Sequence, residues 1–409
     1  MNATYGLLGE KLSHSFSPLI HRLLDNPNYQ LIPLPPDEVG NFLSNGTFQG
    51  INVTVPYKKT VIPYCTQLSP IAERIGSVNT IIRRPDGSLY GDNTDYDGFL
   101  YLVQKSGISI TGKKVLILGS GGSSLTVKTV LTDLQAGEIV VISRTGKDNY
   151  ENLHLHADAQ VIINTTPVGM YPNVGVAPVC LAQFPACEGV IDIIYNPAAT
   201  QLLLDAKKLG IPYINGLSML VAQAKAASER FFNVAYPPQR IDEITRLIEW
   251  ETKNIILIGM PGCGKSAVGE AVADFLHRPF VDLDKKIEEM CGCSIPELFD
   301  QKGEDGFREC EHQVLCDIAK RSGQIIACGG GIVTKPENHD PILQNSFVVY
   351  LKRDLSQLAT EDRPISQSVP LEKLYAQRAP LYESLAQLTV ENNTKPIYVA
   401  AKIVGRLHP

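Results

Sequence analysis

The segment from Gly259 to Ser266, GMPGCGKS, matches the phosphate-loop pattern GxxxxGK[ST]. An apolar, strand-like run precedes it, and the helix-forming stretch AVGEAVADFLH follows it. In such a loop Gly259, Gly262 and Gly264 turn backbone N–H groups toward phosphates, and the helix presents its positive end. The segment therefore predicts a nucleotide-binding α/β domain, with Lys265 at the outer phosphates and Ser266 as a ligand of Mg²⁺.

About 250 residues precede this loop, and a chain of 409 residues predicts two or three domains. Short apolar runs alternate with helical patterns, which favours a parallel α/β architecture. Four of the runs predict one doubly wound sheet in the first half of the chain: residues 114–118, 138–143, 160–164 and 189–195. A polar amphipathic helix after the Pro pair at 237–238 predicts a linker.

The overall charge excludes some partners. The formal net charge is -6 and the pI is about 5.8, which argues against a nucleic-acid surface. No apolar run approaches the roughly 20 residues of a membrane span, and the amino terminus does not resemble a signal peptide. The nine cysteines are scattered, as expected of reduced thiols. We therefore expect a cytoplasmic protein without membrane partners, whose anionic ligands meet local positive charge.

Acids and arginines follow the phosphate loop. FVDLDKKIEE places Asp282 and Asp284 two residues apart at the end of a short strand, which predicts that they lie side by side on one face. One acid would hold Mg²⁺, and the other would orient or deprotonate an acceptor hydroxyl. Arg308, Arg363 and Arg378 stand in separate short motifs. Where two such arginines converge, their planar guanidinium groups can bind a carboxylate bidentately.

The order GxxGxGKS, DxD, GE..FR..E, GGG, RP and RxPLY resembles that of shikimate kinases over nearly all of residues 255–409. The resemblance implies that Asp284 contacts the shikimate hydroxyls, that Arg308 and Arg378 bind its carboxylate, and that Arg363 reaches ATP from a lid. It further implies catalytic roles for Lys265 and Asp284, a metal site at Ser266 and Asp282, and an acceptor site lined by Gly330 and Gly331. A nucleoside or gluconate remains an alternative acceptor.

A second glycine-rich turn lies in the first half of the chain. ILGSGGSS ends a predicted strand with Gly119, Gly121 and Gly122 and leads into a helix, as in a dinucleotide-binding turn. Some 20 residues later, where NAD enzymes usually present an acid, the next strand ends in Arg144 and Thr145. A cation at that position favours the ribose phosphate of NADP.

Polar residues also gather before this turn. In GINVTVPYKK, residues 50–59, apolar positions 51, 53 and 55 alternate with Asn52 and Thr54, which predicts a strand with one polar edge. Lys58 and Asp95 would form a proton-handling pair, because a carbonyl reduced by hydride also needs a proton on oxygen. A structural salt bridge explains that pair, taken alone, equally well.

The motifs HSxSP, NVTVPxK, xVNT, GDNTD, GxGG, SRT, NTTPVGM, YNPxxT and GLxMLxxQ occur in the order of shikimate dehydrogenases, which this part of the chain resembles from Tyr5 to about Phe232. The resemblance implies Lys58 and Asp95 as the catalytic pair. It implies that 3-dehydroshikimate is surrounded by Ser15, Ser17, Asn52, Thr54, Asn79, Asp95, Tyr195 and Gln223. It implies that NADP is flanked by Gly119, Gly121, Gly122, Arg144, Thr145, Thr165 and Met219. The short stretch from Arg144 to Asn164 predicts that one helix of this lobe is trimmed.

Together the two resemblances predict a bifunctional α/β enzyme that reduces 3-dehydroshikimate with NADPH and phosphorylates the resulting shikimate with MgATP. We expect a dehydroshikimate-binding lobe at 1–98 with 218–240, a Rossmann NADP-binding lobe at 99–217, a linker helix at 241–253 and a P-loop kinase domain at 254–409. Two alternatives remain: quinate with NAD as the dehydrogenase substrate pair, and one half that is a degenerate nucleotide-binding regulatory module.

Overall fold

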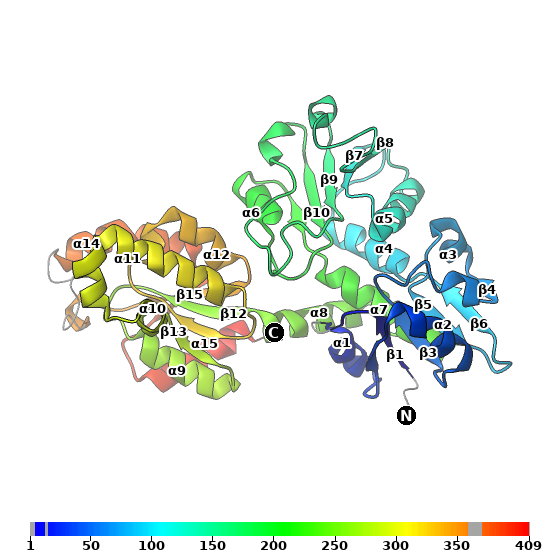
Figure 1. Cartoon of the computed structure of the whole chain (residues 1–409). Helices are drawn as coiled ribbons and strands as arrows, with labels where there is room; N and C mark the ends of the chain where they lie inside the picture. Colours follow the sequence, from blue (N-terminus) through cyan, green and yellow to red (C-terminus); the bar gives the residue numbers. More distant parts are fainter. Residues whose placement is uncertain (1–4, 13–14, 359–369, 409) are drawn as a thin grey trace. The chain divides into compact units, whose positions relative to one another are not determined.

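The computed structural model describes residues 5–12, 15–358 and 370–408. It divides into two compact units. The first comprises Met1–Val168, Ala177–Tyr195 and Asp205–Arg246, and the second comprises Gly169–Val176, Asn196–Leu204 and Leu247–Pro409. Helices lie against each of three sheets, which confirms the predicted α/β class (Figure 1). No helix in the described ranges is both long and apolar enough to cross a bilayer.

The first sheet is mixed and has the strand order β2-β1-β3-β5-β6-β4. Its central strand β3 is buried along its whole length, and β1 pairs with β3 in parallel while β5 pairs with β3 antiparallel. The strands are β1 (Tyr5–Gly9), β2 (Gln30–Pro33), β3 (Gly50–Val53), β4 (Gln67–Leu68), β5 (Thr80–Arg83) and β6 (Leu89–Asp92). The helices of this part are α1 (Ser17–Leu23), α2 (Pro36–Asn45) and α3 (Pro70–Ile75).

The second sheet is wholly parallel and has the order β11-β10-β9-β7-β8. Its strands are β7 (Lys114–Leu118), β8 (Glu138–Ile142), β9 (Val161–Asn164), β10 (Gly189–Asp192) and β11 (Tyr213–Ile214). Strands β8 and β9 lie on opposite sides of β7, so the order in which successive strands are added to the sheet reverses at β7. Doubly wound sheets bind their ligands at such a switch point. The four strands predicted from sequence are all present: β7 has its predicted bounds, and the other three are shorter by one to three residues.

Four helices accompany this sheet: α4 (Asp95–Ser106), α5 (Gly122–Asp133), α6 (Gln201–Lys208) and α7 (Leu217–Phe232). Helix α4 packs against both α5 and α7. Only a short 3₁₀ helix, Leu153–His156, lies between β8 and β9. The predicted trimming of a helix in this lobe is therefore confirmed. The helix α8 (Gln239–Thr252) follows, and the boundary between the two compact units falls within it.

The third sheet, in the second unit, is parallel with the order β13-β14-β12-β15-β16. Its strands are β12 (Asn254–Ile258), β13 (Phe280–Asp282), β14 (Ile325–Ala327), β15 (Ser346–Lys352) and β16 (Leu388–Glu391). Helices α9 and α15 cover one face, and α11 and α12 cover the other (Figure 1). The helices are α9 (Lys265–Leu276), α10 (Leu283–Cys291), α11 (Ile295–Ala319), α12 (His339–Leu343), α14 (Leu371–Leu385) and α15 (Pro396–Leu407).

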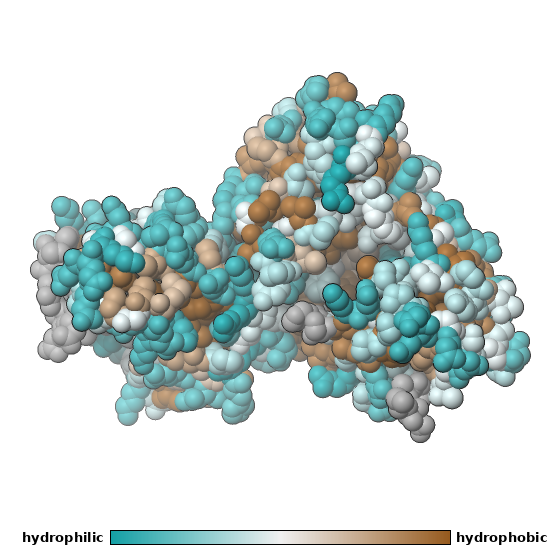
Figure 2. Space-filling view, viewed as in Figure 1, coloured by the Kyte–Doolittle hydropathy of each residue, from teal (hydrophilic) through white to brown (hydrophobic). Residues whose placement is uncertain are grey.

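Apolar side chains are drawn into the cores of these layers. The central strand β12 is buried at all five positions, which is typical of a parallel strand covered on both faces. Hydrophilic side chains cover most of the face seen in Figure 2. The only tryptophan of the sequence, Trp250, packs into the core of the second unit.

Candidate active sites

Lys58 and Asp95 form an ion pair in the first unit. The Lys58 Nζ atom lies 2.5 Å from Asp95 Oδ2, and both side chains are mostly buried. Lys58 follows β3 in a turn, and Asp95 begins α4, where the helix amino terminus favours a negative charge. Asn79 Nδ2 donates to the other oxygen of Asp95 at 2.9 Å. The carboxylate is therefore fixed and holds the ammonium group in one place.

A cavity of about 220 Å³ opens beside this pair. Its size suits a small metabolite, since drug-sized ligands need roughly 300 to 1,000 Å³. Every residue predicted to surround the dehydrogenase substrate lines it: Ser15, Ser17, Asn52, Thr54, Asn79, Asp95, Tyr195 and Gln223. Met219, which the resemblance places beside NADP, also lines this cavity, because α7 carries both Met219 and Gln223 along it. The structure thus brings the predicted substrate residues together from both sheets of the unit.

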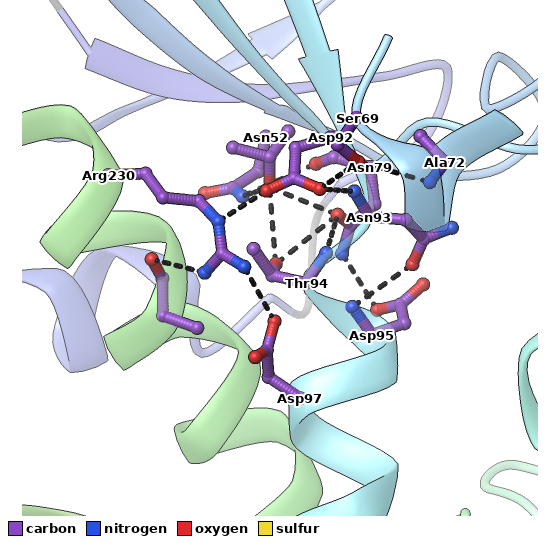
Figure 3. A network of polar contacts seen from close by, with 12 residues as sticks. Asn52, Ser69, Ala72, Asn79, Asp92, Asn93, Thr94, Asp95, Asp97 and Arg230 are labelled. Atoms are coloured by element: carbon purple, nitrogen blue, oxygen red, sulfur yellow. Dashed lines mark hydrogen bonds and ion pairs between the residues drawn. The ribbon is translucent and has the colours of Figure 1, made fainter. Parts of the chain in front are cut away.

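Two of these residues use their side-chain amides within the protein. Asn79 Oδ1 accepts from the Thr94 backbone N–H at 2.7 Å, while its Nδ2 donates to Asp95 (Figure 3). Asn52 Nδ2 donates to Thr80 Oγ1 at 3.0 Å, and its Oδ1 accepts from Tyr29 at 2.7 Å. Their principal contribution is therefore to orient the surrounding polar groups, Asp95 above all.

Behind Asn52 lies a pair of rings that sequence reasoning missed. The His21 imidazole stacks on Tyr29 with ring centroids 3.7 Å apart, and His21 Nδ1 lies 3.0 Å from Ser228 Oγ. Burial lowers the pKa of His21 to about 3, so the ring is neutral and acts as a packing group. A motif of short spacing cannot reveal how this pair is held, because Tyr29 bonds Asn52, 23 residues away, and His21 contacts Ser228, 207 residues away.

The polar-edge prediction for residues 50–59 needs a correction. Strand β3 ends at Val53, and Val55 is 73% exposed although its alternation predicted a buried position. The chain leaves the sheet because Tyr57 N donates to Thr54 O and closes a turn there. This turn directs Lys58 toward Asp95, which a continued strand would not do.

Tyr195 and Gln223 also line the cavity. The Tyr195 ring is 5.6 Å from that of Phe16, and burial raises the pKa of Tyr195, so its hydroxyl stays protonated. Gln223 Nε2 donates to the Leu220 carbonyl at 2.8 Å within α7. Both residues keep polar groups at the edge of the cavity.

A second, larger cavity of about 630 Å³ lies at the switch point of the parallel sheet. It is lined by Gly119, Ser120, Gly121, Ser143, Arg144, Tyr150, Thr165, Thr166, Pro167, Val168, Ala177 and Pro178. Gly119 has a positive φ of 103°. A Cβ atom at Gly121 or Gly122 would project into open space, so protein packing alone does not require glycine there, whereas the close approach of a pyrophosphate does.

Arg144 stands two residues beyond β8 and is exposed. It has no ion pair among the contacts of the described chain, so its charge is available to a ligand phosphate. Thr145 is also exposed but is not part of the cavity wall, and Thr165 lines the wall while donating its hydroxyl to the Leu118 carbonyl at 2.8 Å. Tyr150, from the shortened connection, also lines the cavity and was not predicted. These residues fit NADP.

In the second unit, the phosphate loop connects β12 to α9 as predicted. Gly259 and Gly264 have φ of 148° and 92°, and a Cβ at Gly264 would lie 2.8 Å from Asn392 Nδ2. Asn392 Nδ2 donates to the Cys263 carbonyl at 2.5 Å and braces the loop. Lys265 is largely buried, and its Nζ donates to the loop carbonyls of residues 259 and 260 at 3.0 Å each. Its ammonium group is therefore held over the loop.

The predicted metal ligands are adjacent, because Ser266 Oγ donates to Asp282 Oδ2 at 2.7 Å. Among the described residues no group of three His, Cys, Asp or Glu side chains forms a self-sufficient metal site. Mg²⁺ in phosphoryl-transfer enzymes typically takes one or two protein ligands and completes its shell with phosphate and water. The hydroxyl and carboxylate fit such an ion.

The predicted geometry of Asp282 and Asp284 is wrong. Asp282 ends β13 and caps α10, with its Oδ1 accepting from the backbone N–H groups of Asp284 and Lys285 at 3.1 and 3.4 Å. Asp284 consequently lies in the first helical turn and not on the same strand face. The cap separates the two acids: Asp282 faces Ser266, while Asp284 lies near Gly329, where an added Cβ would be 2.9 Å from its Oδ1.

Arg308, Arg378 and Asp284 act on one buried acid, Glu311. Arg308 Nη1 donates to Glu311 Oε2 at 2.7 Å, and Glu311 is 0% exposed. Burial raises the pKa of Glu311, and the arginines oppose this rise. Gly331 leaves room for the Arg308 guanidinium group, because a Cβ there would clash with it.

The neighbouring Gly330 accepts a hydrogen bond from Tyr382 through its carbonyl, and its Cβ position is filled by Pro261 of the phosphate loop. The second unit therefore brings together two arginines, an acid and the glycine turn beside the phosphate loop. Arg363, predicted to reach ATP, lies outside the described residues. Glu311 was not predicted as a site residue, although it belongs to the quoted motif GE..FR..E.

Comparisons with known proteins find a family match in each half of the chain. A family model for the substrate-binding domain of shikimate dehydrogenase matches residues 7–81, and one for shikimate kinase matches residues 261–408. An NADP⁺-dependent shikimate dehydrogenase of Clostridium beijerinckii is 38% identical over 245 residues, which cover 55% of this chain and 90% of the relative. The corresponding protein of Geobacillus kaustophilus is 36% identical and covers 56% and 93%.

Solved structures of shikimate dehydrogenases are also similar to this chain. A chorismate mutase/shikimate 5-dehydrogenase fusion protein from Clostridium acetobutylicum is 34% identical, with a TM-score of 0.57, over 61% of this chain and 98% of that one. Shikimate 5-dehydrogenase from Thermus thermophilus, in complex with NADP(H) and shikimate, is 29% identical, with a TM-score of 0.54, over 59% and 98%.

Proposed function

The chain belongs to the shikimate dehydrogenase family and carries a shikimate kinase domain, and from this premise we propose that it catalyses two consecutive reactions. The first unit reduces 3-dehydroshikimate to shikimate with NADPH. The second unit transfers the γ-phosphoryl group of MgATP to the 3-hydroxyl of shikimate. One observation carries the proposal: a single chain contains both sets of features. The first set is a Lys–Asp pair in a polar cavity together with a dinucleotide cavity, and the second is a phosphate loop together with two arginines.

In the reductive step, bound NADPH supplies a hydride to the ketone carbon. Lys58 Nζ delivers a proton to the ketone oxygen, so that the C=O double bond becomes C–H and O–H and the charges balance. Asp95 keeps the ammonium group in place through its 2.5 Å contact. Ser15, Ser17, Thr54, Tyr195 and Gln223 supply hydroxyl and amide groups around the ring, which fixes its orientation.

The choice of NADP over NAD rests on Arg144, with the Gly119–Gly122 turn at the pyrophosphate. A guanidinium group attracts the additional ribose phosphate, and no acid occupies the end of β8 to accept the ribose hydroxyls of NAD. This position argues against quinate oxidation with NAD as the main activity.

In the kinase unit, MgATP supplies the phosphoryl group. Asp284 accepts a hydrogen bond from the attacking hydroxyl, Lys265 neutralises phosphate charge, and Ser266 with Asp282 holds the ion. Arg308 and Arg378 bind the acceptor carboxylate beside the Gly330–Gly331 turn. Carboxylate recognition by two arginines favours shikimate over a nucleoside, which has no carboxylate.

The test measures each half on its own. Purified protein is given NADPH with 3-dehydroshikimate, NADH with 3-dehydroshikimate, and NAD⁺ with quinate, and nicotinamide absorbance is followed. Shikimate, gluconate and a nucleoside are then compared as phosphoryl acceptors from MgATP. We expect NADPH and shikimate to give the highest kcat/KM values. If NAD⁺ with quinate is faster, or if one half is silent with all its substrates, the assignment of that half is wrong.

We also place both reactions in the cytoplasm. All nine cysteines belong to the described residues and all are free thiols, which suits a reducing compartment. Fractionation of cells that express the tagged chain tests this placement.

A further inference from the structure

Three carboxylates lie within six residues at the start of α4, and only one of them belongs to the catalytic pair. Asp92 ends β6, Asp95 begins α4, and Asp97 follows in the first helical turn. Lys58 pairs with Asp95, so the other two acids need a second cation. Arg230, near the end of α7, provides it (Figure 3).

Asp92 is the more buried of the two additional acids, with a side chain that is 7% exposed. Its Oδ1 accepts from Ser69 Oγ at 2.5 Å and from the Asn93 backbone N–H at 2.7 Å. Its Oδ2 forms an ion pair with Arg230 Nε. An ionised acid in such a position is stable only when it is paired and hydrogen-bonded, so Asp92 depends on Arg230.

The guanidinium group of Arg230 bridges two elements at once. Its Nη2 donates to Asp97 Oδ2 at 2.9 Å, and its Nη1 donates to the Ala226 carbonyl of α7 at 3.0 Å. Burial raises the pKa of Asp97, and the Arg230 charge opposes this rise. A planar fork of five donors suits this arrangement, and the single ammonium group of lysine does not.

Hydrogen bonds link Asp92, through Asn93, to Asp95 of the catalytic pair. Asn93, whose backbone N–H is held by Asp92, accepts from the Asp95 backbone N–H through its Oδ1 at 3.2 Å, and Asn93 Nδ2 donates to the Ser77 carbonyl at 2.8 Å. Every residue from Asp92 to Asp95 is therefore fixed by at least one hydrogen bond to another residue (Figure 3). The position of Asp95 relative to Lys58 depends on this short segment.

Helix α7 also carries Gln223 at the substrate cavity. Arg230 lies seven residues later, two turns along the same helix, and so ties the helix that bears a substrate residue to the segment that bears the catalytic acid. The extensive packing of α4 against α7 keeps both helices in register.

From these contacts we infer that Arg230 is a positioning residue of the dehydrogenase reaction, which neutralises Asp92 and Asp97 and thereby holds Asp95 and α7 in their working arrangement. The inference rests on the proposed reductase activity of the first unit. Arg230 does not line the substrate cavity, so it acts through its partners.

The experiment compares four purified full-length variants with the parent: Arg230→Met, Arg230→Lys, the double variant Arg230→Met/Asp92→Asn, and the control Arg240→Met. Asn at position 92 keeps an oxygen for Ser69 and Asn93 but carries no charge. Arg240 is a matched control, because it pairs with Glu243 on α8 and bonds the Leu23 carbonyl far along the chain from the catalytic segment. For each variant, kcat and KM for 3-dehydroshikimate, the Kd for NADP⁺ and the thermal unfolding temperature are measured.

We expect Arg230→Met to lower kcat about tenfold to a hundredfold, the loss typical of a small displacement of a reacting group. The Kd for NADP⁺ stays within about twofold, because the dinucleotide cavity has no contact with Arg230. Arg230→Lys gives an intermediate loss. The double variant recovers about threefold or more of the kcat lost by Arg230→Met, because the uncompensated charge of Asp92 is gone, and Arg240→Met keeps the parent kcat.

A purely structural role predicts a lower unfolding temperature with unchanged kcat at temperatures where the variant is folded. The inference is overturned if the kcat of folded Arg230→Met lies within twofold of the parent, or if Asp92→Asn recovers none of the loss. If Arg230→Met does not bind NADP⁺ and is misfolded, the test depends on the kcat of Arg230→Lys. A kcat of Arg230→Lys equal to that of the parent then overturns the inference. A parent chain that does not reduce 3-dehydroshikimate overturns both this inference and the proposed function, whereas an active parent with unaffected variants overturns the inference alone.

Discussion

Removal of the Arg308 side chain should destabilise the second unit, and the loss should grow with pH. Glu311 is 0% exposed, and Arg308 Nη1 lies 2.7 Å from its carboxylate. Burial raises the pKa of Glu311 in the folded state. Because the folded chain then binds the proton more tightly than the unfolded chain does, this group's contribution to stability is complete at low pH and is lost as the pH rises. Arg308→Met removes the charge that opposes this effect.

The magnitude follows from proton uptake. Without Arg308, Glu311 can take up a proton and so avoid carrying an unpaired charge in the core. This protonation costs about 1.4 kcal/mol for each pH unit above the ordinary pKa of 4.5. The penalty is therefore limited to about 1.4 kcal/mol near pH 5.5 and to about 4 kcal/mol near pH 7.5. The larger value agrees with the roughly 3 to 5 kcal/mol observed when one partner of a buried pair is removed.

The fluorescence of Trp250 reports this unfolding specifically, because it is the only tryptophan and lies in the core of the second unit. For a unit of this size we expect the unfolding temperature of Arg308→Met to fall by roughly 8 to 16 °C near pH 7.5 and by about a third of that near pH 5.5. Lys335→Met is the control, since its pair with Glu309 is more exposed and should contribute less than about 1 kcal/mol.

A second variant separates charge from packing. Arg308→Met combined with Glu311→Gln should regain most of the stability lost near pH 7.5, because residue 311 then carries no charge to be buried. The reasoning is refuted if the penalty of Arg308→Met is equal at both pH values, or if the double variant is as unstable as the single one near neutral pH.

Three further variants test individual roles. Lys58→Met should lower kcat for 3-dehydroshikimate reduction about 10²-fold to 10⁴-fold with the Kd for NADP⁺ unchanged, and retention of a tenth of the parent kcat would contradict its role as proton donor. Arg144→Ala should raise the KM for NADPH about tenfold or more while leaving that for NADH within twofold; equal effects on both cofactors would exclude phosphate recognition. Lys265→Met should lower shikimate phosphorylation by more than about a hundredfold and leave NADPH oxidation at the parent rate, and unchanged phosphorylation would show that Lys265 is dispensable.

Patterns confined to a few adjacent residues could be predicted well from the sequence. The phosphate loop, the dinucleotide turn and the strands of the second sheet depend on local glycine spacing and apolar runs, and the structure has them where they were expected. The trimming of a helix between β8 and β9 was predicted from the shortness of that connection, and only a 3₁₀ helix lies there. Each of these features is encoded within one short segment.

Several features that depend on long-range contacts were not predicted. Arg230 and Asp97 are 133 residues apart, and no local pattern relates them. The capping of α10 by Asp282 separates it from Asp284, because backbone N–H groups compete for a carboxylate that the sequence alone assigned to a strand. Likewise, the turn closed after Thr54 exposes Val55 against the alternation of its neighbours. In each case the position of the residue is determined by its hydrogen-bond partner, which the residue type alone does not reveal.

The most direct test of the central claim is one incubation of the purified chain with 3-dehydroshikimate, NADPH and MgATP, with NADPH omitted from a parallel sample. Nicotinamide absorbance and shikimate 3-phosphate are followed together. The account predicts that NADPH is consumed and that the phosphate ester forms only in its presence. NADPH consumption without any phosphate ester, even after shikimate is added, would contradict the kinase assignment; phosphorylation of added shikimate with no NADPH consumption would contradict the reductase assignment.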